Sequence, residues 1–317
     1  MLDSVTGVPV RGRRLVRASC SFTLTALLAA CASGPSAAPR STRAPAKGTI
    51  AFESNRGSTD YDIWVVNADG TGLKQLTSLA GAEFQPAWSP DGAKIAFQEH
   101  RSSGPGDSDI YVMAADGSDP VRLTKGAGWD VTPAWSPDGR SIAFACHAES
   151  HPDLCLTKQD GSHRIRITKG RTADLFPTWS PDGSRIFFIR ILSGDAADYG
   201  DVYVVNVDGT DLTRITSGQR IGDYALSPDG SQLIVHDTKT STIQRIDPYS
   251  GSSSTVVDTD FGAHYVHPAW SPDGTEIALA GDTANPLDLY VVNADGSGLM
   301  KVPNGEAASD PAWKPEP

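Results

Sequence analysis

The stretch PAWSPDGAKIAF, residues 86–97, has the composition of a strand, a tight turn and a second strand. In its Ser-Pro-Asp-Gly segment, proline occupies the second turn position, where its fixed φ suits a type I turn, and a glycine follows. The residues on either side are apolar and include Trp, Ile and Phe, which are frequent in strands. The stretch therefore predicts a β-hairpin.

Close variants of this stretch return along the chain, starting at Pro133, Pro177, Tyr224 and Pro268. The anchor positions of the repeat are Trp88, Trp135, Trp179, Leu226, Trp270 and Trp313. Successive anchors are 47, 44, 47, 44 and 43 residues apart. A period in the forties is typical of a four-stranded propeller blade and too long for leucine-rich or tetratricopeptide units.

Each unit continues with an apolar strand, a polar loop of variable length, a third strand, an Asp-Gly turn and a short fourth strand. Residues 48–77 contain the last three strands of a unit without the Trp strand, whereas residues 310–315 are a Trp strand with nothing after it. Together they complete one blade, and such a split seals the ring. No amphipathic helical pattern follows Gly48. We predict an all-β fold, a six-bladed β-propeller with four-stranded blades.

The pattern PAWSPDG…IAF…DIYVM…RLT resembles the TolB-type β-propeller repeat, a relative of the WD repeat, over essentially all of residues 48–317. The resemblance implies a protein or peptide partner that docks at the mouth of the central channel. The repeat occurs in periplasmic scaffolds and as an accessory domain of peptidases, and the protein after which it is named carries a smaller α/β domain ahead of its propeller. Residues 1–47 leave no room for one, so we expect a likeness to the propeller half alone.

The N-terminal segment has the features of an export signal. Four arginines precede the apolar run of residues 21–30, which is too short to span a bilayer, and Leu-Ala-Ala-Cys ends at Cys31. This ending resembles a bacterial lipobox, in which Cys31 would be lipidated. The alternative is an ordinary signal peptide with Cys31 incidental. We predict a lipoprotein signal peptide (1–30), a disordered Pro-rich tether (31–47) and the propeller (48–317), lipid-anchored outside the cytoplasm to the cell membrane or outer membrane.

The chain is acidic, with a formal net charge of −11. Removal of residues 1–30, whose net charge is +3, gives −14 for the mature chain, and the tether contributes another +3, which leaves the propeller near −17. Such a surface argues against nucleic acid and against direct adsorption to anionic lipid. We expect a monomer that contacts the membrane only through its lipid anchor.

Cys146 and Cys155 lie nine residues apart in consecutive predicted strands. In an oxidising compartment this spacing permits a cross-strand disulfide. The alternative is a pair of separate buried thiols that pack as small apolar groups.

The candidate binding residues lie in the connections that enter each Trp strand, on the face with the long, divergent loops. Placed by the repeat, they would ring the channel mouth and bind a cation or a basic group of an envelope protein or peptide. They are Glu83, Asp130, Asp174, Asp223, His267 and Asp310. The alternative is that these side chains cap their own loop turns. The aspartates of the Ser-Pro-Asp-Gly turns are assigned to turn formation alone.

The chain has no Gly-x-Ser-x-Gly or His-Glu-x-x-His motif. We therefore expect a non-catalytic binding scaffold without a cofactor, and a divalent cation at the channel mouth is a second hypothesis. His264 and His267 flank Tyr265-Val266 and are the candidate metal ligands. They keep open the alternative of a metal-dependent carbohydrate-active, lyase-like or hydrolytic propeller.

Overall fold

The computed structural model describes residues 48–101, 108–125, 128–148, 151–192, 199–257, 264–282 and 287–316. The elements in these ranges are all β-strands, so the all-β prediction is confirmed. Within the same ranges, no helix is long and apolar enough to cross a membrane. Cys31, the predicted signal peptide and the predicted tether lie outside the described residues.

The described strands form six antiparallel sheets of four strands each, and each sheet is one blade. Blade 1 consists of β24 (Ala308–Trp313), β1 (Thr49–Ser54), β2 (Asp62–Asn67) and β3 (Lys74–Gln75). Blade 2 consists of β4 (Ala82–Trp88), β5 (Lys94–His100), β6 (Ser108–Ala114) and β7 (Val121–Arg122). Blade 3 consists of β8 (Asp130–Trp135), β9 (Ser141–Ala148), β10 (His151–Lys158) and β11 (Ile165–Arg166). Blade 4 consists of β12 (Ala173–Trp179), β13 (Arg185–Ile191), β14 (Asp201–Asn206) and β15 (Thr213–Arg214). Blade 5 consists of β16 (Ile221–Leu226), β17 (Leu233–Asp237), β18 (Thr242–Ile246) and β19 (Ser253–Val257). Blade 6 consists of β20 (His264–Trp270), β21 (Glu276–Asp282), β22 (Asp288–Asn293) and β23 (Met300–Glu306).

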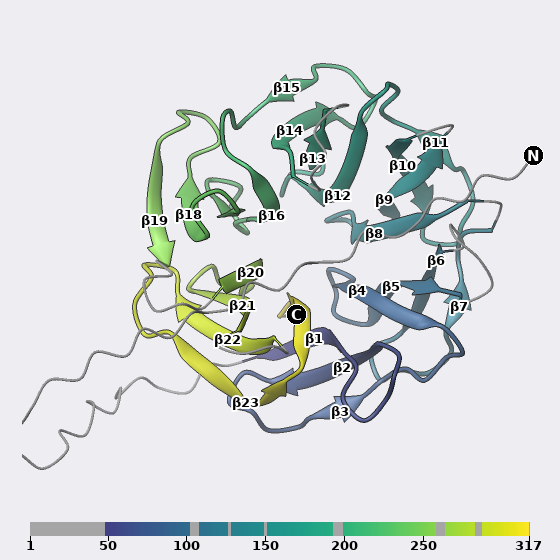
Figure 1. Ribbon diagram of the computed structural model, residues 1–317. Coiled ribbons are helices and arrows are strands. Elements are labelled where there is room, and N and C mark those ends of the chain that lie inside the picture. Colours follow the sequence, from purple (N-terminus) through teal and green to yellow (C-terminus); the bar gives the residue numbers. More distant parts are fainter. Residues whose placement is uncertain are drawn as a thin grey trace, which may run out of the picture. The chain divides into compact units, whose positions relative to one another are not determined.

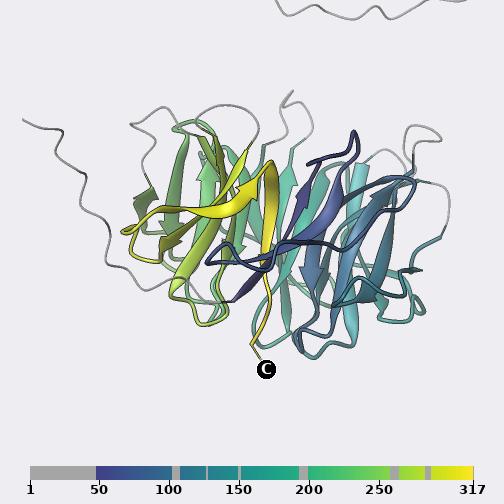
Figure 2. The same cartoon turned by 90° about the horizontal axis from the view of Figure 1, so that it is seen from below.

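The blades are arranged around a central axis, with the strand that carries the repeated Trp or Leu position innermost (Figure 1). Each innermost strand contacts those of its two neighbours, and β20 contacts β24, so the ring is closed. The strands run between two faces, as the side view in Figure 2 shows. We call the face with the Ser-Pro-Asp-Gly turns and the C-terminus the turn face, and the opposite one the loop face.

The Ser-Pro-Asp-Gly hairpins are held by their own side chains. The Ser89 hydroxyl donates to the Asp91 carboxylate at 2.6 Å and accepts the backbone N–H of Lys94 at 2.9 Å. Gly92 adopts a left-handed φ of 64°, which favours glycine. The same Ser–Asp contact, also at 2.6 Å, recurs at Asp138, Asp182, Asp229 and Asp273. These contacts account for the repeated aspartates by turn formation, because each carboxylate is used within its own turn.

The split blade is confirmed by the pairing of β24 with β1. Trp313 lies opposite Ile50, and Ala312 lies opposite Ala51. The Trp88 indole of blade 2 donates to the carbonyl of Ala312 at 3.1 Å, so the closing strand also contacts the next blade. The two ends of the domain thus form one sheet.

The core lies within and between the blades. The second strands of blades 1 to 4 contribute four fully buried phenylalanines: Phe52, Phe97, Phe144 and Phe188. Trp88, Trp135 and Trp313 are at most 8% exposed, whereas Leu226 takes the Trp position in blade 5 and is half-buried. Buried residues follow one another along these second strands without alternation, because neighbouring blades cover both faces of each sheet.

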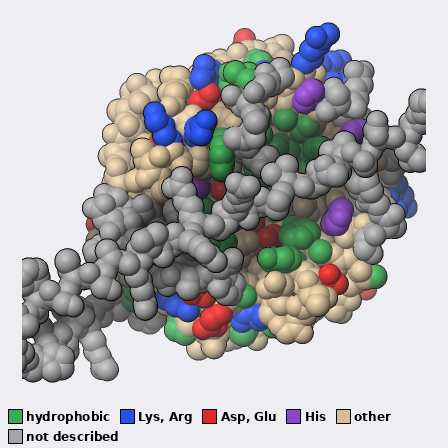
Figure 3. Space-filling view, in the orientation of Figure 1, with side chains coloured by type: hydrophobic (Ala, Val, Ile, Leu, Met, Phe, Trp, Pro, Cys, Tyr) green, Lys and Arg blue, Asp and Glu red, His purple; other side chains and the backbone are tan. Residues whose placement is uncertain are grey.

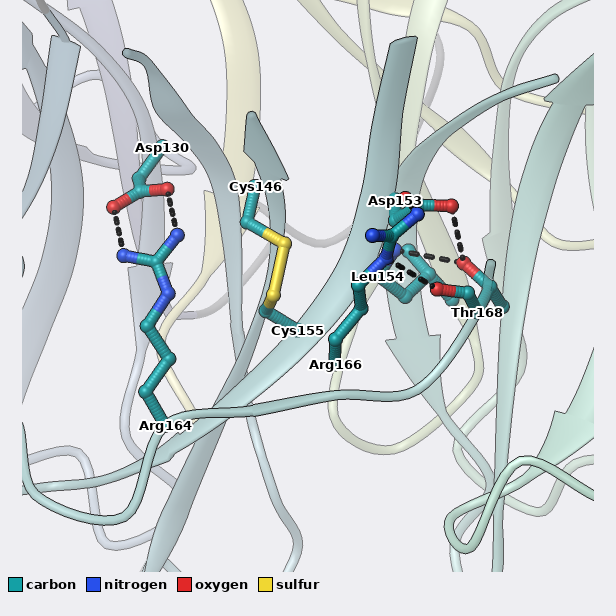
Figure 4. The surroundings of a disulfide bond; sticks show 8 residues. All are labelled: Asp130, Cys146, Asp153, Leu154, Cys155, Arg164, Arg166 and Thr168. Atoms are coloured by element: carbon teal, nitrogen blue, oxygen red, sulfur yellow. Dashed lines mark hydrogen bonds and ion pairs between the residues drawn. A yellow bond between two sulfur atoms is a disulfide. The ribbon is translucent and has the colours of Figure 1, made fainter. Parts of the chain in front are cut away.

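Blade 3 carries a covalent cross-link in addition to the polar contacts that join its outer strands. A disulfide joins Cys146 on β9 to Cys155 on β10, and both residues are at most 3% exposed (Figure 4). Beside it, Arg166 pairs with Asp153, and the Thr168 hydroxyl accepts the N–H of Leu154 at 2.9 Å (Figure 4). Equivalent threonines, Thr77, Thr124 and Thr216, bind the third strands of blades 1, 2 and 4.

Candidate functional site: the central channel

The inner strands contain a bulge just before the Trp anchor. In five blades the residue at this point precedes a proline and adopts a left-handed φ between 47° and 56°: Gln85, Thr132, Phe176, His267 and Asp310. A residue before proline normally prefers an extended backbone, and a left-handed non-glycine residue costs about 1–3 kcal/mol. Strain of this kind persists where the surrounding structure imposes it, and it often marks a functional site.

The bulges explain which side chains reach the axis. Side chains of a regular strand point to the two faces of the sheet, and in a propeller both faces are covered by neighbouring blades. A bulge re-aims one residue and can direct it along the sheet plane into the channel. The resulting cavity has a volume of about 150 Å³. Its lining comes from all six inner strands: Gln85, Pro86, Thr132, Pro133, Phe176, Pro177, Thr178, Asp223, Tyr224, His267, Pro268, Asp310 and Pro311.

One side of this cavity carries a cluster of charged groups. His267 lies between two aspartates, with Nε2 at 3.5 Å from Asp223 Oδ2 and Nδ1 at 3.5 Å from Asp310 Oδ2. Glu53 on β1 lies behind them, where it accepts the Ser309 hydroxyl at 2.7 Å and the Gln85 N–H at 2.9 Å. The opposite side of the cavity is neutral and includes Thr132 and Phe176. Two of the six blades therefore supply the carboxylates and a third supplies the imidazole.

The titration of the cluster reflects burial and mutual interaction. Burial and then the Asp310 carboxylate raise the pKa of Glu53 to about 8. Burial raises the pKa of Asp223, and the His267 charge opposes this shift. For His267, burial acts to lower the pKa, but the carboxylates of Asp310 and Asp223 outweigh it and the pKa is raised. The cluster therefore takes up or releases protons near neutral pH.

Only three of the six predicted channel residues line the cavity. Asp223, His267 and Asp310 do so, whereas Glu83, Asp130 and Asp174 are at most 6% exposed and lie outside it. The physical reason is that the latter three precede the bulge, where the strand is still regular and its side chains face a neighbouring sheet. The sequence missed Glu53, because it lies on the second strand of its blade and reaches the cluster only through the β24–β1 pairing.

The three buried carboxylates do not cap their own turns as the alternative supposed. Asp130 pairs with both terminal nitrogens of Arg164 at 2.8 Å, as Figure 4 shows. Asp174 pairs with Arg190 at 2.7 Å in the same two-bond manner. Glu83 has no cationic partner among the described residues. Burial, together with the nearby carboxylates of Asp62 and Glu99, raises the pKa of Glu83 to about 8.

In the described part of the chain, no three His, Cys, Asp or Glu residues are arranged to hold a metal ion. His267 belongs to the channel cluster described above. His264 is the first residue of β20, but its side chain lies outside the described residues. The predicted metal pair therefore stays a prediction.

Two protein-family models match the chain, and both describe β-propeller domains. The model of the TolB β-propeller domain matches residues 124–317, and that of the tricorn protease N-terminal β-propeller domain matches residues 47–154. The Tol-Pal system protein TolB of Nitratidesulfovibrio vulgaris is 39% identical over 51 residues, which are 16% of this chain and only 12% of that protein.

Solved structures agree with the fold. TolB from Acinetobacter baumannii superimposes with a TM-score of 0.71 at 22% identity, over 85% of this chain and 67% of that one. The structure of a TolB from Agrobacterium tumefaciens gives a TM-score of 0.63 at 19% identity, over 85% of this chain and 99% of that one. With the repeat, the ring closure and the family match taken together, the chain belongs to the TolB β-propeller domain family.

Proposed function

We propose that this protein is a non-catalytic scaffold of the bacterial cell envelope, which binds a basic segment of a protein or peptide partner at the loop-face mouth of its channel. The observation that carries the proposal is the cluster of Asp223, Asp310 and Glu53 around His267. Acidic side chains are visible near the middle of the loop face in Figure 3. The family match supports a binding role, since the first family relative is named for the Tol-Pal system.

The cluster suits a lysine ammonium or an arginine guanidinium. Asp223 and Asp310 lie on opposite sides of His267, so a cation above the imidazole would interact with both carboxylates. Partial burial strengthens such contacts relative to bulk water. The inner-strand bulges hold the groups in place before binding, which lowers the ordering cost of association.

The pH dependence has a definite sign. At pH 6 the protonated His267 neutralises part of the acidic charge. As pH rises toward 8, Glu53 gains charge because its pKa is raised to about 8, while the raised pKa of His267 lets it keep its proton to higher pH than a free imidazole. The cavity then becomes more negative, so affinity for a basic group should increase over this range.

The test uses a fluorescently labelled pentalysine peptide as the probe, titrated at several salt concentrations and at pH 6 and pH 8. Asp310→Asn should weaken binding about tenfold and reduce the salt dependence. The matched control is Glu316→Gln, which removes one exposed charge outside the channel lining. Equal affinity of the two variants would contradict the channel site. Oligosaccharide turnover that a chelator abolishes would instead favour the lyase-like alternative and a divalent cation.

Lipid anchoring through Cys31 is part of the proposal. A tether of roughly sixteen residues would let the propeller reach a few tens of Å from the membrane by random-coil scaling. Cys31→Ser should move the protein from the membrane fraction to the soluble fraction, because a lipid chain is the contact that we propose. If the variant stays membrane-bound after a high-salt wash, the lipobox assignment is wrong.

A further inference from the structure

A second cavity opens between blades 4 and 5, away from the central channel. Its volume is about 650 Å³. The described residues that line it come from the ends of β13 and β14 and the positions beside them, from β15, from the β15–β16 connection and from the β17–β18 turn: Arg190, Leu192, Tyr199, Gly200, Asp201, Arg214, Gly218, Gln219, Arg220 and Lys239. It shares no lining residue with the channel cavity.

The charge of this lining is opposite to that of the protein as a whole. Four cations face one carboxylate, Asp201, in a chain whose formal net charge is −11. Lys and Arg side chains gather over blades 4 and 5 in Figure 3. The carboxylates of Asp174 and Asp201 neutralise Arg190 and Arg214, so the positive charge that remains for an anion comes from Arg220 and Lys239.

Two of the cations are fixed in place by ion pairs. Arg190 binds Asp174 through Nε and Nη2 at 2.7 Å. Arg214 donates from Nε to the Thr216 carbonyl at 2.8 Å and from Nη2 to Asp201 at 2.5 Å. In both residues these contacts leave Nη1 for a ligand. The ion pairs therefore fix the orientation of two guanidinium groups that line the cavity.

The other two cations have positioned backbones and exposed side chains. The Asp237 carboxylate accepts the N–H of Arg220 at 3.4 Å and the N–H of Lys239 at 3.0 Å, and so ties the β15–β16 connection to the β17–β18 turn. The Arg220 carbonyl accepts the N–H of Thr238 at 2.8 Å. Among the described residues, no ion pair joins the side chain of Arg220 or Lys239 to a carboxylate.

We propose that this interblade cavity binds a phosphate group. Arginine forks match phosphate oxygens in geometry, and lysine adds a compact charge. Arg190 and Arg214 are already paired with carboxylates, whereas Arg220 and Lys239 are not within the described part of the chain. This set of donors suits an anion that carries more than one negative charge or accepts hydrogen bonds from several donors at once. Tyr199 and Leu192 provide apolar surface for the organic part of a phosphate ester. The phosphate could belong to a soluble ester or to a phospholipid headgroup.

The experiment measures binding of inorganic phosphate and glycerol 3-phosphate by calorimetry, and binding to phosphatidylglycerol vesicles by sedimentation, with the full propeller at low salt. The double variant Arg220→Gln/Lys239→Gln should lose about tenfold or more in affinity, since it removes two charge-assisted contacts. Both side chains are exposed, so the fold should be retained, as a melting curve would verify.

The matched control is Lys125→Gln/Arg171→Gln, which removes the same charge from exposed positions in the β7–β8 and β11–β12 connections, the equivalents of the connection that carries Arg220. A loss confined to Arg220→Gln/Lys239→Gln supports the site. Binding of the soluble phosphates identifies a free ester as the source, and binding of vesicles alone identifies a headgroup. Equal losses in both double variants, or no binding of any probe by the wild type, would overturn the proposal.

Discussion

Deletion of residues 309–317 tests how the ring is closed. The deletion removes most of β24, and with it the pairing of Trp313 with Ile50 and of Ala312 with Ala51. It also removes the carbonyl that accepts the Trp88 indole N–H. The β1 edge, which is fully buried at Ile50, would become an open strand edge next to the channel.

The magnitude can be bounded from one side chain. Trp313 is 6% exposed and packs in a cluster with Ile50, Phe52 and residues of blade 6 such as Leu289. Truncation of a buried Trp to Ala costs about 3–5 kcal/mol. At about 2–4 °C per kcal/mol for a domain of this size, Trp313→Ala should lower the melting temperature by about 10 °C. The strand deletion should lower it further, because backbone pairing is lost as well.

The assay is thermal unfolding followed by circular dichroism, with light scattering to detect association through the open edge. The control is deletion of residues 315–317, which follow the strand and leave Trp313 and Lys314 in place. This control should melt within about 2 °C of the wild type. A 309–317 deletion that melts like the control and stays monomeric would refute closure by β24.

Two further predictions concern buried groups. Cys146→Ala/Cys155→Ala should cost about 2–3 kcal/mol, the entropic estimate for a cross-link nine residues apart, and wild type melted with a reductant should show the same loss; no effect of reductant would contradict this. Glu83 has a folded-state pKa of about 8, above its ordinary 4.5, so the folded state binds more protons and stability should fall as pH rises from about 5 to 8. In urea unfolding at pH 5.5 and pH 8, Glu83→Gln should reduce the loss of stability between the two pH values, and Glu53 should account for the loss that remains. A loss of stability larger than that of the wild type would contradict the raised pKa of Glu83.

The sequence by itself determined the blades, their number and the way the ring closes. These properties depend on contacts between residues that are close in sequence. One example is the Ser-Pro-Asp-Gly turn, in which the Ser89 hydroxyl donates a hydrogen bond to the Asp91 carboxylate. Leu226 could be placed in the Trp position because the turn that follows it repeats unchanged. The sequence placed Cys146 and Cys155 in consecutive strands, and the structure decided for a disulfide over two separate thiols. Local chemistry repeated five times leaves few alternative folds.

Only the tertiary structure decided which carboxylates reach the channel. In sequence, Glu83 lies five residues before its Trp anchor and Asp310 three, and both are predicted to line the channel mouth. The bulge before proline turns Asp310 into the channel, while Glu83 stays on a regular strand against the next blade. Arg220 and Lys239 likewise come together because two blades pack side by side. Such neighbours are distant in sequence, and their contact depends on the packing of whole sheets, which no local pattern encodes.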